Sequence, residues 1–154
     1  MRARFLVAGL LLMGWILAGC GFGQQLVSPV QTLVVMPFEN RSHAPGLEWI
    51  SEAFPEVLGQ RMVSDDLYVL SRDYRTHAYD RAGIPAGVHP SRASLYRIAE
   101  QMDVNYAVLG SYSFDGQTFI ASAQVLDMKD RRLFPQVQES GPLPKLLEVE
   151  SGLA

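Results

Sequence analysis

Apolar and polar residues form blocks along the chain, and the first blocks predict buried strands. Residues 32–36, TLVVM, are a nearly continuous apolar run that leads into the sequence PFEN. Such a run favours a central strand that is covered on both faces of its sheet. Residues 66–72, DLYVLSR, predict a second strand.

Two further blocks have the spacing of amphipathic helices. Within residues 45–63, apolar side chains recur at Leu47, Ile50, Phe54, Val57, Leu58 and Met62. Because an interior proline breaks helix geometry, we expect a short first turn, with Pro55 starting the main helix. Residues 91–103 carry the clearest helical pattern, and Ser91 or Ser94 is suited to cap that helix.

The strand pattern returns in the last third of the chain. Residues 105–114 and 117–127 read as a hairpin joined by Asp115-Gly116, a pair that favours a type I′ turn. Residues 132–140 predict an edge strand, since Pro135 would disrupt a central one. The order β-α-β-α-β-β-β predicts an α/β fold with a single mixed β-sheet and two main helices on one of its faces.

The polar segment 73–90 has no clear period and reads as a long surface loop, with a helical turn inside it as an option. Tyrosine and arginine, which are enriched at protein interfaces, gather in and around it, with Tyr74 and Arg75 as candidate partner-binding residues. The others are Arg72, Tyr79, Arg81, Arg92 and Tyr96. The alternative is a solvated loop whose tyrosine rings cover the edge of the sheet.

A second candidate site is the loop 39–49, which follows the first strand. Ligands of open α/β sheets bind near the carboxyl ends of strands, so Asn40, Arg41 and Ser42 are candidates to contact a ligand or partner. The alternative is structural, with the Asn40 side chain bonding nearby backbone to stabilise a turn.

The amino terminus has a different character. Residues 1–4 carry two arginines, residues 5–19 carry no charge, and Cys20 is the only cysteine of the 154 residues. Fifteen residues span about 22 Å as a helix, less than the ~30 Å of a bilayer core. The pattern predicts a secretory signal peptide over 1–19. A short membrane anchor or a buried helix are the alternatives.

Residues 17–20, LAGC, resemble the lipobox of bacterial lipoproteins. By that resemblance, Leu17, Ala18 and Gly19 precede a cleavage site, and Cys20 receives lipid, including acyl chains such as palmitate. Removing 1–19 would leave 11 basic and 16 acidic residues, a net charge of −5. Residues 20–31 read as a tether. Because Gly21 is not aspartate, we expect the outer membrane, with the protein facing the periplasm.

Residues 32–128 resemble the TolB amino-terminal-type domain and the related FlgO- and CsgG-like envelope modules. The resemblance rests on VVMPFEN at 34–40, LYVLSR at 67–72 and DVNYAVLGSY at 103–112. It departs at Asp103, where relatives have glycine, and at Pro55. It implies a non-catalytic module, binding to other envelope proteins, possible homo-oligomers and a domain over 32–140. Residues 142–154 then begin a carboxyl-terminal helix, the first part of a truncated tetratricopeptide-repeat region.

Composition and motifs exclude several classes of function. The chain is 48% hydrophobic and carries a net charge of −3, which argues against binding to nucleic acid. No HExxH, CxxC or GxSxG motif is present, and His43, His77 and His89 are scattered, so we expect no metal, no cofactor and no enzyme activity. We expect a scaffolding or protein-binding module. The alternative is a domain that senses a small ligand at the edge after the first strand.

Overall fold

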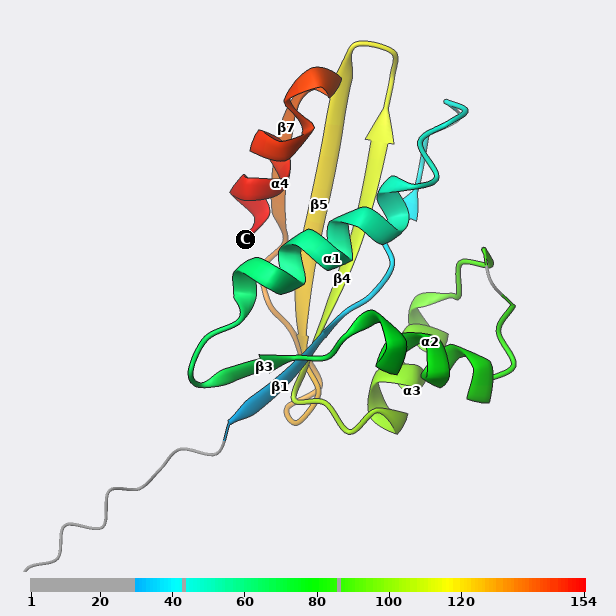
Figure 1. The fold of residues 1–154 in the computed structure, drawn as a ribbon, viewed down its shortest axis with the longest axis vertical. Coiled ribbons are helices and arrows are strands. Elements are labelled where there is room, and N and C mark those ends of the chain that lie inside the picture. Colours follow the sequence, from blue (N-terminus) through cyan, green and yellow to red (C-terminus); the bar gives the residue numbers. More distant parts are fainter. Residues whose placement is uncertain (1–29, 43, 86) are drawn as a thin grey trace, which may run out of the picture.

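The computed structural model describes residues 30–42, 44–85 and 87–154, which form a mixed sheet with helices on both faces (Figure 1). The strands are β1 (Gln31–Val35), β2 (Glu39–Asn40), β3 (Leu67–Val69), β4 (Tyr106–Phe114), β5 (Thr118–Asp127), β6 (Arg132–Leu133) and β7 (Val137–Pro142). The helices are α1 (Ile50–Met62), α2 (Arg72–Arg81), α3 (Arg92–Gln101) and α4 (Leu146–Leu153), with a 3₁₀ turn at Leu143–Lys145. The predicted signal peptide, lipobox and Cys20 lie outside the described residues.

The sheet confirms the predicted α/β class. Its order is β3-β1-β4-β5-β6, with β2 on β4 and β7 on β5. The pairs among β3, β1, β2 and β4 are parallel, and those of β5 with β4, β6 and β7 are antiparallel. Within the described residues, no helix combines the length and apolar character needed to cross a bilayer.

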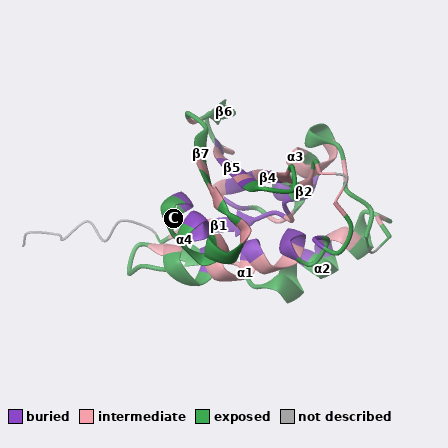
Figure 2. Cartoon of the chain, turned by 90° about the horizontal axis from the view of Figure 1, so that it is seen from above, coloured by how far each residue is buried: buried purple, intermediate pink, exposed green. Residues whose placement is uncertain are grey.

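Strand β1 is the central strand that the sequence predicts, and it is covered on both faces. Leu33 and Val35 belong to a core with α1 and α4, whereas Val34 and Met36 belong to a core with α2 and α3. Figure 2 shows buried residues gathered in the sheet and on the helix surfaces that face it. The expectation that both main helices share one face is therefore wrong. A strand that is apolar at odd and even positions needs cover on both sides.

The segment 73–90 is not one long loop, because helix α2 occupies its first half. The helix turns only Arg75 and Ala78 fully inward, so an apolar period is missing from its sequence. Helix α1 also differs from expectation, since it starts at Ile50 and runs through Pro55. Pro55 cannot donate to the carbonyl of Ser51, four residues earlier. That carbonyl instead accepts the Phe38 amide at 3.0 Å, so it stays satisfied.

The hairpin β4–β5 is confirmed, but its turn differs from the predicted type. Gly116 has φ 100°, whereas Asp115 is not among the residues with positive φ, so the pair lacks the two positive φ angles that a type I′ turn requires. The predicted last strand is split by Pro135 into β6 and β7, both paired with β5. At the end of α3, Asp103 has φ 53°, a left-handed conformation that glycine adopts without strain.

A bulge between β1 and β2 holds the sheet to helix α1. Val35 pairs with Val108 and Glu39 with Ser111, so residues 36–38 lie opposite only residues 109–110. The ring of Phe38, which is fully buried, lies against Gly110 so closely that a methyl group there would overlap it. The absence of a side chain at Gly110 is therefore what lets the ring approach the β4 backbone.

We predict that Gly110→Ala lowers the free energy of unfolding by about 2–3 kcal/mol, because the added methyl overpacks the core. Phe38→Leu lacks the distal ring atoms that meet Gly110. Adding Gly110→Ala to Phe38→Leu should therefore cost less than the same change in the parent protein. Urea unfolding of the four proteins measures this coupling, and equal costs in both backgrounds would contradict the contact.

Helix α4 carries an acidic residue inside the core. Glu150 is 1% exposed, and its oxygens lack a hydrogen-bond partner, although the Arg61 guanidinium lies 3.3 Å away. Burial raises the pKa of Glu150 above its ordinary value of 4.5, and Arg61 opposes that shift. The folded protein therefore binds this proton more tightly than the unfolded chain does.

We predict that the contribution of Glu150 to stability falls as pH rises from about 4.5 through its raised pKa. Glu150→Gln should remove this fall and increase the free energy of unfolding at pH 7, with the gain shrinking toward pH 4. Glu148→Gln, an exposed change on the same helix, is the control. Urea unfolding between pH 4 and 7 tests the prediction, and parallel pH profiles for the parent protein and Glu150→Gln would contradict it.

Candidate functional site

Helices cover one face of the sheet along only part of its length, and the candidate site lies where this cover ends. The hairpin β4–β5 extends past α2 and α3 toward its turn (Figure 1). Near the helices its residues on that face are apolar, with Ala107 and Leu109 on β4 and Leu126 on β5. Beyond the helices, the corresponding alternate positions carry Ser111, Ser113, Ser122 and Gln124, and also Ile120 opposite Ser113. The face thus changes from apolar to mainly polar and uncharged where its helical cover ends.

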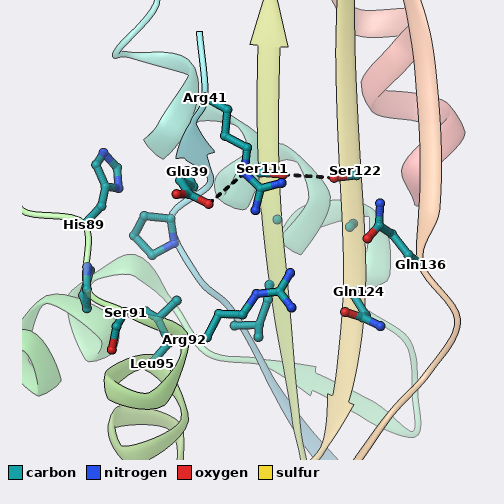
Figure 3. A pocket seen from close by; sticks show the side chains of 15 residues that line it. Glu39, Arg41, His89, Ser91, Arg92, Leu95, Ser111, Ser122, Gln124 and Gln136 are labelled. Atoms are coloured by element: carbon teal, nitrogen blue, oxygen red, sulfur yellow. Dashed lines mark hydrogen bonds and ion pairs between the residues drawn. The ribbon is translucent and has the colours of Figure 1, made fainter.

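A hollow of about 120 Å³ lies at this change. Figure 3 shows its walls: β2 supplies Glu39, and Arg41 follows directly after β2. The sheet supplies Ser111, Ser122 and Gln124, and the start of α3 supplies Arg92. His89 and Gln136 complete two sides. The guanidinium groups of Arg41 and Arg92 approach β4 from different elements, while the Ser111 and Ser122 hydroxyls bond each other at 3.0 Å. The hollow is therefore lined mainly by polar groups.

The free charge of the hollow is positive. Arg41 pairs with Glu39 at 3.0 Å, but both side chains are more than half exposed, at 52% and 56%. Such exposed pairs are worth only about 0–1 kcal/mol, so Arg41 can exchange its partner at little cost. Arg92 has no ion pair within the part of the chain that the structure describes. An acidic group entering the hollow would meet two guanidinium groups and several neutral hydrogen-bond donors.

The loop 39–49 divides its predicted site residues between two roles. Arg41 lines the hollow, as the ligand-binding interpretation requires. Asn40 instead accepts hydrogen bonds from the Ser42 amide and hydroxyl, at 2.9 and 2.6 Å, which is the structural alternative. Ser42 is thereby tied to the turn, although it borders a second shallow depression near Phe114.

The two candidates on α2 are also different in kind. Tyr74 is 61% exposed and remains available to a partner. Arg75 is 4% exposed and donates to the Val35 carbonyl at 2.9 Å and to the Glu52 carboxylate at 2.6 Å. The carbonyl lies at the end of β1, past the last residue of β3, so Arg75 supplies a donor that no neighbouring strand provides. Arg75 therefore links α2 to β1 and α1 through these hydrogen bonds.

No motif in the sequence identifies the polar sheet face directly, although one signal is present. Serines at 111, 113 and 122 and glutamine at 124 alternate with apolar residues along strands that are apolar elsewhere. Arg92 was only one of several arginines near the polar segment, and the start of α3 places it over β4. The sequence pattern does not show that residues from β2, α3 and β5, which are distant in the chain, line the same hollow.

The hollow is suited to noncovalent binding. Among residues 30–42, 44–85 and 87–154, no three His, Cys, Asp or Glu side chains converge to hold a metal ion. The serine hydroxyls of the hollow bond each other, and the adjacent histidine, His89, shows no hydrogen bond to either one. What the arrangement can do is bind an acidic or hydrogen-bonding group of another molecule.

Comparison with known proteins places the fold among domains of bacterial lipoproteins. The carboxyl-terminal domain of LpoB from Salmonella enterica superposes with a TM-score of 0.58 at 14% identity, over 77% of this chain and 87% of that one. Lipoprotein GNA1162 from Neisseria meningitidis gives 0.55 at 14% identity, over 78% and 92%. The LpoB domain from Escherichia coli gives 0.57 at 15% identity, over 75% and 84%.

These likenesses are likenesses of fold. No family model matches the sequence, and no curated protein matches it. The resemblance to TolB amino-terminal-type domains therefore stays a prediction. The tetratricopeptide repeats expected after residue 154 and the domain boundaries stay predictions as well.

We predict opposite results for two neighbouring alanine substitutions on α2. Arg75→Ala should lower the free energy of unfolding by about 2–4 kcal/mol, because the Val35 carbonyl loses its buried donor. Tyr74→Ala should change it by less than about 0.5 kcal/mol, because the ring is exposed. Thermal and urea unfolding measure both, and equal stability of the two variants would contradict the assigned positions.

Proposed function

We propose that this protein is a lipid-anchored protein of the bacterial cell envelope whose folded domain binds a partner protein and catalyses no reaction. Cys20 carries the lipid, residues 20–31 include the tether, and the domain faces the periplasm from the outer membrane. The fold is shared with bacterial lipoprotein domains, among them a meningococcal lipoprotein. That likeness supports the envelope assignment and the absence of enzyme activity.

The observation that carries the proposal is the uncovered sheet face around the Arg41–Arg92 hollow. Both faces of the sheet are covered near β1, yet the outer half of β4 and β5 is open on one side and polar there. A sheet face of hydroxyl and amide groups is stable in water without a covering helix. It also offers hydrogen bonds and two guanidinium groups to a protein surface.

The charge of the hollow indicates the chemistry of the partner. The protein is acidic as a whole, and repels acidic proteins at a distance. The hollow is a local exception, with Arg41 and Arg92 against the single carboxylate of Glu39. We therefore expect the partner to place an aspartate or glutamate side chain there. A separate cavity at the carboxyl end of β1 favours the alternative function, binding of a small ligand.

We predict that a photo-crosslinking amino acid at Gln124, in the membrane-anchored protein in its own cells, forms a discrete adduct with one envelope protein. Arg41→Glu together with Arg92→Glu should reduce that adduct at least five-fold, because an acidic side chain is then repelled. Immunoblotting of the membrane fraction measures the adduct.

Two controls make the result specific. The same crosslinker at Lys129, in the exposed turn after β5, should give no such adduct. Arg131→Glu with Arg132→Glu matches the charge change away from the hollow and should leave the adduct intact. An adduct that survives reversal of Arg41 and Arg92, or that forms equally at Lys129, would refute the proposed surface.

A further inference from the structure

A cavity of about 430 Å³, larger than the Arg41–Arg92 hollow, lies between α1, α2 and the residues that follow α2. Pro37, which follows the carboxyl end of β1, is among its lining residues, and parallel sheets commonly bind ligands at that end of their strands. Pro37 and His89 are the only lining residues that it shares with the hollow of Figure 3. The cavity is thus a separate site with its own chemistry.

One side of this cavity is apolar. Ile84, Pro85 and Val88 line it from the connection after α2, and Tyr79 lines it from α2 itself. The Tyr79 hydroxyl is buried without a hydrogen-bond partner, and burial raises the pKa of Tyr79, so the side chain is neutral. A wall of this composition accommodates an aliphatic or aromatic segment of a ligand.

The arginines of the cavity are already engaged. Glu52 binds Arg75 at 2.6 Å and lies 3.6 Å from Arg72, and Arg75 also lies 3.6 Å from Glu56. Since Arg75 is 4% exposed and bonded to the Val35 carbonyl as well, its charge is not available to an anionic ligand. Arg72 is 60% exposed and its pair with Glu52 is weak, but the lining carboxylates of Glu48, Glu52 and Asp80 still outnumber the two guanidinium groups.

The acidic groups are in the opposite situation. Glu48, just before α1, and Asp80, near the end of α2, both line the cavity. Neither has a basic partner among the residues described by the structure, and both are exposed. The uncompensated charge of the cavity is negative, whereas that of the neighbouring hollow is positive.

We propose that this cavity binds an alkylammonium group, with its aliphatic stem against Ile84, Pro85 and Val88 and its charged head at Glu48 and Asp80. Such a group combines an apolar stem with one compact cation, which matches the two kinds of lining. It is present in lysine side chains of proteins and in free aliphatic amines. The inference does not depend on the proposed protein-binding surface, because the two sites have different walls.

The test is a titration of the isotope-labelled full chain in detergent micelles with n-butylammonium, followed by amide chemical shifts at constant ionic strength. We expect shifts at Asp80, Ile84 and Val88 with a dissociation constant on the order of 1–10 mM, since the probe has few atoms. n-Butanol and pentanoate, which have the same butyl stem, should bind at least five-fold more weakly. Equal binding of butanol, or tighter binding of pentanoate, would overturn the proposal.

Substitutions give a second readout. Glu48→Gln with Asp80→Asn should weaken n-butylammonium at least five-fold, while Asp65→Asn with Asp66→Asn, an equal charge change at the exposed turn before β3, should not. Equal weakening by both pairs would reduce the effect to long-range charge and overturn the site. Tighter binding of Nα-acetyl-lysine methylamide would indicate a lysine of a protein as the source, and tighter binding of 1,4-diaminobutane would indicate a free amine.

Discussion

The position of Phe38 against Gly110 determines how β1, β2 and helix α1 fit together. The ring fits only because residue 110 has no side chain, and it packs edge-on against Phe54 of α1 with ring centroids 5.5 Å apart. The Phe38 backbone is fixed to the same helix, since its amide donates to the Ser51 carbonyl and its carbonyl accepts the Ser51 hydroxyl. Phe38 therefore lies in the bulge and packs against α1. Its amide also satisfies the Ser51 carbonyl, which has no helical donor because residue 55 is proline. After the bulge, the chain pairs with β4 again as strand β2, and Arg41, the next residue, lines the hollow.

Helices and strands could be predicted from the sequence where residues close together in the chain determine the structure. The apolar run of β1, the helical period of α3 and the hairpin around Gly116 each occupy the predicted place. Prediction failed where the cause is a contact between distant residues. Helix α2 is stabilised by Arg75 reaching the Val35 carbonyl and Glu52, so its inward face shows no apolar period. Helix α1 tolerates Pro55 because Phe38 bonds the Ser51 carbonyl, and a single segment of sequence does not reveal that bond.

The candidate site was predicted in part for the same reason. Arg41 follows the first strand, and the rule that ligands bind after strand ends applies to it. The opposing wall comes from α3 and β5, about 50 and 80 residues later in the chain, and only the parallel pairing of β1 and β2 with β4 brings these elements together. Arg75 was predicted to bind a partner but is buried, because arginine is common at interfaces and also forms buried hydrogen bonds. Its exposure, rather than its identity, separates it from Tyr74.

The two cavities follow from how unequally the helices cover the sheet. Helices α2 and α3 lie over the same end of one face, which leaves the polar half of β4 and β5 open beyond them and a gap between α2 and α1 beside β1. Pro37 and His89 border both spaces, so the bulge that seats Phe38 also shapes the boundary between them. The free charges on its two sides have opposite signs, with Arg92 in one space and Glu48 and Asp80 in the other. A partner surface that presents an acidic and a basic side chain next to each other would therefore be held in one orientation, because turning it around would set like charges against each other.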